Sequence, residues 1–173
     1  MHTRVHARPM LALMCLLLPA SASAATPAKP SEEAPALAAV RGGQNLCYSA
    51  SVLVNDKKDA ALVTMAETQL AAALKGLGLK ALQYDAADTC DRELYFSFSV
   101  DVDGEPTIYQ DFLTVYSYVA NDGKVELPMA QIWRDGMYGG NKKVLTRAEY
   151  TKTMTDDLKT LLDEVKVDYA SLK

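Results

Sequence analysis

Histidine is absent from nearly all of this chain, because both histidines, His2 and His6, lie among the first six of its 173 residues. The absence excludes Ser-His and Cys-His nucleophile pairs and every zinc site that contains histidine from the rest of the protein. Any catalysis there would have to use carboxylates, tyrosine, lysine or backbone groups. We expect no metal and no cofactor.

Long apolar runs are also lacking, and the longest is "MLALMCLLLPA" near the N-terminus. It is too short for a membrane-spanning helix, which needs about 20 apolar residues. Arg4 and Arg8 precede it, and Ala22 and Ala24 follow it in an A-x-A cleavage pattern, so residues 1–24 are predicted to be a signal peptide. We therefore expect an exported protein, periplasmic or extracellular, with Cys15 removed with the signal and no transmembrane segment in the mature chain.

Positive charge is scarce. Without Arg4 and Arg8, 16 basic residues remain against 22 acidic ones, a net charge of −6. Binding to a phosphate backbone needs a basic surface. A nucleic-acid partner is therefore not expected, whereas an acidic chain of this kind suits a basic target.

Two cysteines remain after the signal, Cys47 and Cys90. In an exported protein such a pair is usually a disulfide, although two buried thiols are the alternative. The bond would stabilise the fold by roughly 4 kcal/mol through its loop entropy. It requires the connector at residues 85–91 to run back along the sheet, because a simple hairpin would place Cys90 at the opposite end.

The spacing of apolar residues and the local composition divide the chain after the signal peptide into a leader and one domain. Residues 25–44 are rich in proline and alanine and are predicted to be a flexible leader, followed by a single domain at residues 45–173. Apolar residues recur every three or four positions over residues 59–77, which predicts a helix that glycines end. Thr146 and Glu149 form a capping box at the start of a longer helix of the same pattern.

Strict alternation of apolar and polar side chains predicts the strands. Leu94, Phe96 and Phe98 fall on one face of their strand and Tyr95 and Ser97 on the other, as in an antiparallel sheet with one wet face. The segment "DVDGE" that follows begins like a calcium loop, but proline and phenylalanine occupy the positions where such a loop needs glycine and glutamate. We interpret it as a hairpin turn. The later "GMYGGNKK" is also predicted to be a turn.

The element order is therefore β-α-β-β-β-β-α. We predict an α+β fold, a two-layer sandwich in which a four- to five-stranded, mostly antiparallel sheet carries both helices on one face. The first two strands should be parallel because a β-α-β crossover is right-handed.

The candidate binding residues are aromatic. Tyr95, Tyr116 and Tyr118 are predicted to share the uncovered face of the sheet, with Tyr109 or Trp133 beside them. Such a surface suits binding, although cross-strand aromatic pairs that only stabilise the sheet are the alternative. The carboxylate pairs of the chain are interpreted as solvated surface, and no catalytic residue is assigned.

Several of these segments together resemble a known group of proteins. The helix that ends in glycine, the strand "LYFSFSVDV", the single tryptophan before a glycine-rich turn and the closing "LKTLLDEVKVDYASLK" resemble small exported bacterial proteins of unknown function. The element order is also similar to periplasmic lipoproteins that assist envelope transport, such as the lipopolysaccharide-assembly lipoprotein and auxiliary lipoproteins of ABC exporters. Those proteins are anchored by a lipidated cysteine, and the resemblance carries no catalytic residue over.

We therefore expect an exported, non-catalytic binding or accessory protein of the cell envelope, whose partner is an envelope protein or ligand. Two alternatives stay open. A secreted hydrolase using carboxylates would show a deep cleft lined by at least two acids. An inhibitor or immunity-type protein would use its acidic charge against a basic target.

Overall fold

The computed structural model describes residues 29–32, 34–38, 45–84, 90–118 and 130–172. The expected signal peptide and the proline of the segment "KVELP" lie outside this part. The elements, in chain order, are η1 (Ala34–Leu37), β1 (Leu46–Val54), β2 (Lys57–Lys58), α2 (Ala60–Gly76), β3 (Ala81–Gln83), β4 (Arg92–Asp101), β5 (Thr107–Ser117), β6 (Ala130–Asn141) and α3 (Arg147–Ser171).

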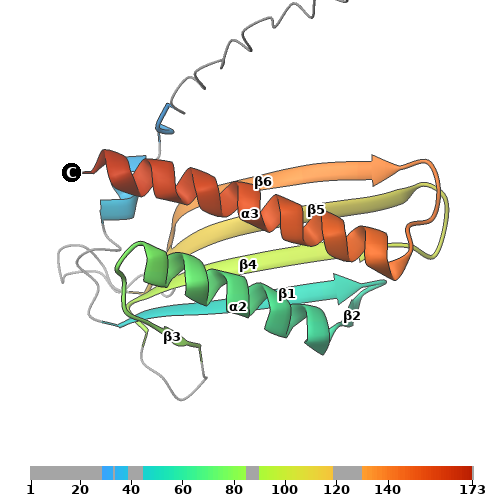
Figure 1. The fold of residues 1–173 in the computed structure, drawn as a ribbon, viewed down its shortest axis with the longest axis horizontal. Helices are drawn as coiled ribbons and strands as arrows, with labels where there is room; N and C mark the ends of the chain where they lie inside the picture. The colour runs from blue at the N-terminus through green and yellow to red at the C-terminus, as the bar shows by residue number, and fades with distance from the viewer. Residues whose placement is uncertain (1–28, 33, 39–44, 85–89, 119–129, 173) are drawn as a thin grey trace, which may run out of the picture.

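The strands form one mixed sheet in the order β2-β1-β4-β5-β6, with the short β3 paired to β1. β3 and β4 both run parallel to β1, whereas β4, β5 and β6 are antiparallel to one another. The helices α2 and α3 lie side by side across one face of this sheet (Figure 1). The predicted α+β class, the two layers and the parallel first crossover are confirmed.

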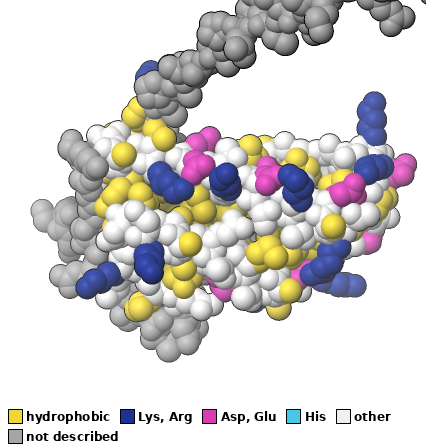
Figure 2. Space-filling view, in the orientation of Figure 1, with side chains coloured by type: hydrophobic (Ala, Val, Ile, Leu, Met, Phe, Trp, Pro, Cys, Tyr) yellow, Lys and Arg dark blue, Asp and Glu magenta, His cyan; other side chains and the backbone are white. Residues whose placement is uncertain are grey.

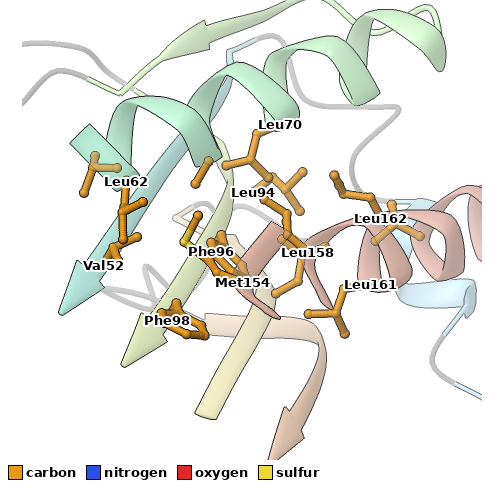
Figure 3. Close-up of a cluster of buried hydrophobic side chains, with 14 of the residues drawn as sticks. Val52, Leu62, Leu70, Leu94, Phe96, Phe98, Met154, Leu158, Leu161 and Leu162 are labelled. Atoms are coloured by element: carbon orange, nitrogen blue, oxygen red, sulfur yellow. The ribbon is translucent and has the colours of Figure 1, made fainter. Parts of the chain in front are cut away.

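The core fills the space between the sheet and the two helices. Phe96 and Phe98 point from β4 toward Leu70 of α2 and Met154 and Leu158 of α3, as the close-up shows (Figure 3). All five side chains are at most 1% exposed. Burying a side chain of this size stabilises a fold by about 1.5 to 3 kcal/mol, so this layer supplies most of the driving force for folding.

The helix ends follow the predicted capping chemistry. Asp59 accepts the backbone N–H of Leu62 at the start of α2, and Gly78, with φ +74°, follows the end of that helix. At α3 the hydroxyl of Thr146 accepts the N–H of Glu149 while the Glu149 carboxylate accepts the N–H of Thr146. The capping box is confirmed.

The described part of the leader packs against the domain. Ala34 and Leu37 of η1 are 3% and 1% exposed, and the Ser31 N–H donates to Asp168 of α3 at 2.7 Å. The prediction of a flexible leader over residues 25–44 is therefore wrong for these residues, because Leu37 joins the hydrophobic core.

The segment predicted to be a glycine-rich turn is a strand instead, since β6 continues to Asn141. The glycines lie under aromatic rings of the neighbouring strand. A Cβ on Gly136 would lie 2.2 Å from Cδ1 of Phe112, and one on Gly139 would lie 2.1 Å from the ring of Tyr109. These glycines are therefore sites of close packing within a strand and not turn residues.

The connection at "DVDGE" joins β4 to the antiparallel β5, as the hairpin interpretation requires. Its N-terminal part is held by side chains: the Asp103 N–H donates to Asp101 and the Val102 N–H donates to Asn55. Within the described residues no group of three or more His, Cys, Asp or Glu side chains is placed to hold a metal ion.

Candidate functional site

The face of the sheet turned away from α2 and α3 carries the candidate site, and we call it the open face. Strand register defines it, because residues directly opposite one another share a face. One row across β1, β4, β5 and β6 is Ser49, Tyr95, Thr114 and Arg134, and the rows beside it are Ser51, Ser97, Phe112 and Gly136, and Leu53, Ser99, Gln110 and Tyr138. Neither α2 nor α3 covers these rows.

Tyr95 and Tyr116 lie in contact on the open face, as their strand positions predict. Their ring centroids are 6.0 Å apart with an interplanar angle of 47°. Both side chains are partly exposed. An aromatic pair in this geometry is worth about 0.5 to 1.5 kcal/mol, so part of its role is structural.

Tyr118 belongs to the same group through a buried carboxylate. Its hydroxyl donates to Oε2 of Glu93, while the hydroxyl of Ser49 donates to Oε1. Glu93 is only 6% exposed. Burial, together with the hydrogen bond to Glu93, raises the pKa of Tyr118 well above its usual range. The network fixes the orientation of the Tyr118 ring at this end of the open face.

Trp133 is not part of the open face, and its predicted placement is wrong. It is 2% exposed and lies on the helix side, where its indole N–H donates to Oδ2 of Asp168 at 3.0 Å. The regular register of β6 fixes this side, because Trp133 pairs with Val115, whose side chain is buried beneath the helices. The bulge in β6 begins only beyond Trp133, where Tyr116 pairs with Gln131.

Tyr109 also lies on the helix side of β5. Its ring stacks on that of Phe98, with centroids 6.2 Å apart and an interplanar angle of 26°. Of the five aromatic residues considered from the sequence, the structure therefore brings Tyr95, Tyr116 and Tyr118 together and leaves Tyr109 and Trp133 on the opposite side.

A second aromatic group on the open face was not predicted. The rings of Phe112 and Tyr138 meet edge to face at 5.3 Å, and the guanidinium carbon of Arg134 lies 3.6 Å above the ring of Phe112. Tyr138 is 73% exposed. Alternation along β5 could have found Phe112, but Tyr138 required the knowledge that "GMYGGN" is a strand.

A cavity of about 460 Å³ opens beside this second group. Its lining includes Ser99, Gln110, Ile108 and Tyr138 from the strands, with Asp101, Asp103 and the turn at residues 55–56 at its acidic end. Ile108 is 61% exposed. The open face thus has an aromatic and hydroxyl-rich centre and a hollow at one end, with exposed apolar side chains that a partner could cover.

The predicted disulfide is present. Cys47 and Cys90 are bonded, with their Cα atoms 5.8 Å apart. The expected geometric difficulty disappears because β4 does not form a hairpin with β3. Instead it pairs with β1 in parallel, so that Arg92 lies opposite Leu46 and both cysteines fall at the same end of the sheet. The connector at residues 85–89 lies outside the described residues.

Carboxyl groups also meet, on the helix side. A cavity of about 430 Å³ is lined by Asp135, Asp163, Glu164 and Asp168, with Lys29 and Ser31 of the leader segment. Asp135 lies within hydrogen-bond reach of Glu164 and raises its pKa. A glycosidase holds its two carboxyl groups about 5 to 9.5 Å apart, with the scissile bond between them. Two carboxyls in direct contact do not have that geometry.

No helix in the described part of the chain is long and apolar enough to cross a membrane.

No protein-family model matches the chain, and no curated protein does. Among solved structures, it is similar to a PelC dodecamer from Paraburkholderia phytofirmans, with 12% sequence identity over 71% of this chain and 86% of the PelC chain, at a TM-score of 0.34.

Proposed function

We propose that this chain is an exported, non-catalytic binding protein of the cell envelope, and that the open face is its partner-binding surface. The observation that carries the proposal is a sheet face that neither α2 nor α3 covers and that bears two aromatic groups. Tyr95 and Tyr116 form one, and Phe112, Arg134 and Tyr138 form the other.

The composition of the open face favours a protein as the partner. Tyrosine and arginine are enriched in protein interfaces, and tyrosine with serine is typical of antibody binding surfaces. Here Tyr95 and Tyr138 are interleaved with Ser51, Ser97 and Ser99 in adjacent rows. The rings offer rigid contact area, while the hydroxyls adapt to the hydrogen-bonding groups of a partner.

Export is supported by the expected signal peptide and by the disulfide. Structural disulfides persist in oxidising compartments and are rare in the cytosol, and the Cys47–Cys90 bond joins the start of β1 to the chain just before β4. Fractionation of cells that express the full chain should find a product beginning at Ala25 outside the cytoplasm. An unprocessed product retained in the cytoplasm would contradict this part of the proposal.

The binding surface can be tested with tyrosine-to-serine variants. Immobilised residues 25–173 should capture an envelope protein, and the exchange Tyr138→Ser should lower the captured amount several-fold. Because Tyr138 is 73% exposed, the melting temperature should change by no more than about 2 °C. The double exchange Tyr95→Ser and Tyr116→Ser should abolish capture, with a larger loss of thermal stability because their ring contact is removed.

The matched control is Met65→Ser on α2, a 40% exposed apolar side chain on the helix layer. Capture should be unchanged in this variant. If Met65→Ser reduces capture as strongly as Tyr138→Ser, or if neither does, the open face is not the binding surface. If capture falls only in proportion to thermal stability, the tyrosines have a structural role alone.

A further inference from the structure

The contact between α3 and the sheet contains more acidic groups than a helix packed on a core usually has. Asp157, Glu164 and Asp168 are spaced seven and four residues apart on α3, so they lie along one side of the helix. Asp111 of β5 and Asp135 of β6 meet two of them. We call the four residues Asp111, Asp135, Asp157 and Glu164 the acid clamp.

Asp111 is the deepest member of the acid clamp. Its side chain is 0% exposed, and both of its carboxylate oxygens are buried without a hydrogen-bond donor among the residues that the structure describes. Asp157 of α3 lies within hydrogen-bond reach of it and is partly buried. Two ionised carboxylates at this distance in a desolvated site would repel strongly. One shared proton removes the repulsion and supplies the missing donor.

The second pair repeats the arrangement on the next strand. Asp135 of β6 and Glu164 of α3 lie within hydrogen-bond reach of each other and line the same acidic cavity as Asp168. Asp168 is 3% exposed and already accepts the Trp133 indole N–H and the N–H of Ser31. These donors satisfy Asp168, and the group of the second pair whose pKa is raised is Glu164.

We propose that the acid clamp is a pH-sensitive device, in which each carboxyl pair holds one proton between α3 and the sheet, so that α3 is held firmly in acidic surroundings and loosens progressively as the pH rises toward and through neutral. The device acts on the layer opposite the open face. It is therefore independent of the proposed binding surface, and either can fail without the other.

The raised pKa values of the two carboxyl pairs determine the direction in which stability changes with pH. Burial, reinforced by Asp157, raises the pKa of Asp111 to about 7, and contact with Asp135, reinforced by burial, raises the pKa of Glu164 to about 7. Burial also raises the pKa of Asp157. The folded chain therefore holds these protons more tightly than the unfolded chain, and stability falls as the pH rises from about 4 toward 7.

Most of the other charged groups near the two pairs also raise the pKa values of the paired carboxyls. Asp135 adds to the field at Asp111, Asp156 adds to the field at Asp157, and Asp168 adds to the field at Glu164. Tyr109 stays neutral, because burial and the two aspartates raise its pKa. The Met137 N–H has the opposite effect and lowers the pKa of Asp111. Lys29 and Asp163 line the cavity of the second pair.

The test is urea unfolding of residues 25–173 at pH 5.5 and pH 8.0, followed by the fluorescence of Trp133. Each pair should raise the equilibrium constant for unfolding by about 30-fold between these two values, given a folded pKa of about 7 and an unfolded pKa near 4. In Asp111→Asn and in Glu164→Gln an amide replaces the shared proton as donor. In each variant the pH dependence of unfolding that comes from the substituted pair should therefore be lost. In the double variant the equilibrium constant for unfolding should be nearly independent of pH.

The control is Asp56→Asn, at an exposed turn position that lines the cavity beside Tyr138 and is not a member of the acid clamp. It should keep the full pH dependence of the unsubstituted chain. Hydrogen exchange at pH 8.0 should accelerate in α3 more than in α2, which a general loss of stability would not produce.

Three results would overturn the proposal. The unsubstituted chain could unfold equally easily at both pH values, or the double variant could keep its pH dependence. Alternatively, millimolar calcium at pH 8.0 could restore the stability seen at pH 5.5, which would make the pairs a cation site and not a proton-sharing clamp.

Discussion

The two faces of β4 are made from one continuous stretch of chain, yet they have opposite character. Phe96 and Phe98 are at most 1% exposed beneath the helices, whereas their neighbours Tyr95 and Ser97 are partly exposed on the open face. On the helix side these rings pack against α2 and α3 in the hydrophobic core. The open face keeps polar and aromatic groups that packing does not require, so it is the face free to take on a function.

The outer surface of the helix layer differs from both. Seen from that side, basic and acidic side chains are scattered along α3 and α2 with apolar atoms between them (Figure 2). Several are exposed ion pairs within one helix, such as Lys152 with Asp156 and Lys166 with Asp163 at 2.6 Å. Pairs of this kind contribute little to stability. They keep this surface solvated, in contrast to the aromatic open face.

The largest expected effect on stability comes from substituting neighbouring residues on the two faces of β4. Phe96→Ala should lower the free energy of unfolding by about 3 to 5 kcal/mol, because a fully buried ring is removed and a cavity remains. Tyr95→Ala should cost only about 1 kcal/mol, the value of its contact with Tyr116. Urea unfolding of both variants measures the difference. Equal losses would mean that the open face is as fully packed as the helix side.

The disulfide gives the next largest effect. Replacing Cys47 and Cys90 by serine should lower the free energy of unfolding by between about 2 and 4 kcal/mol, since the bond closes a separation of 43 residues. Thermal unfolding of the double variant, and of the unsubstituted chain with a reductant, should agree. A reductant that leaves the melting temperature unchanged would show that the bond does not form.

The smallest effect tests the start of α3. Thr146→Ala removes the side chain that accepts the Glu149 N–H, and should cost about 1 kcal/mol. Thr160→Ala, the same exchange in the exposed middle of the helix, should be neutral or slightly stabilising because alanine favours helix more than threonine. Chemical denaturation of the pair separates the cap from helix propensity, and equal losses would contradict the capping assignment.

Local sequence patterns were sufficient to predict much of the fold. The alternation of Leu94, Phe96 and Phe98, the capping box at Thr146 and the glycine after α2 predicted the two layers, because each depends on neighbours in sequence. The disulfide was also predicted, but its geometry depended on β4 pairing with β1, which is a tertiary choice.

The errors share one physical cause, which is that contacts distant in sequence override local pattern. Pairing with Val115 of β5 places Trp133 on the helix side. Close approach of Phe112 makes Gly136 a strand residue. The burial of Leu37 fixes part of the leader. The acid clamp could not be predicted either, because nothing near Asp111 in the sequence indicates that Asp157 will face it.

The most direct test of the central claim is photo-crosslinking on the two sides of the molecule. Benzoyl-phenylalanine would replace Ile108, which is 61% exposed on the open face, or Met65, which is 40% exposed on α2. After irradiation of cells that export the chain, we predict a discrete adduct with one envelope protein at position 108, lost on Tyr95→Ser and Tyr116→Ser, and none at position 65. Adducts at position 65 alone, or the same adducts at both positions, would contradict the account.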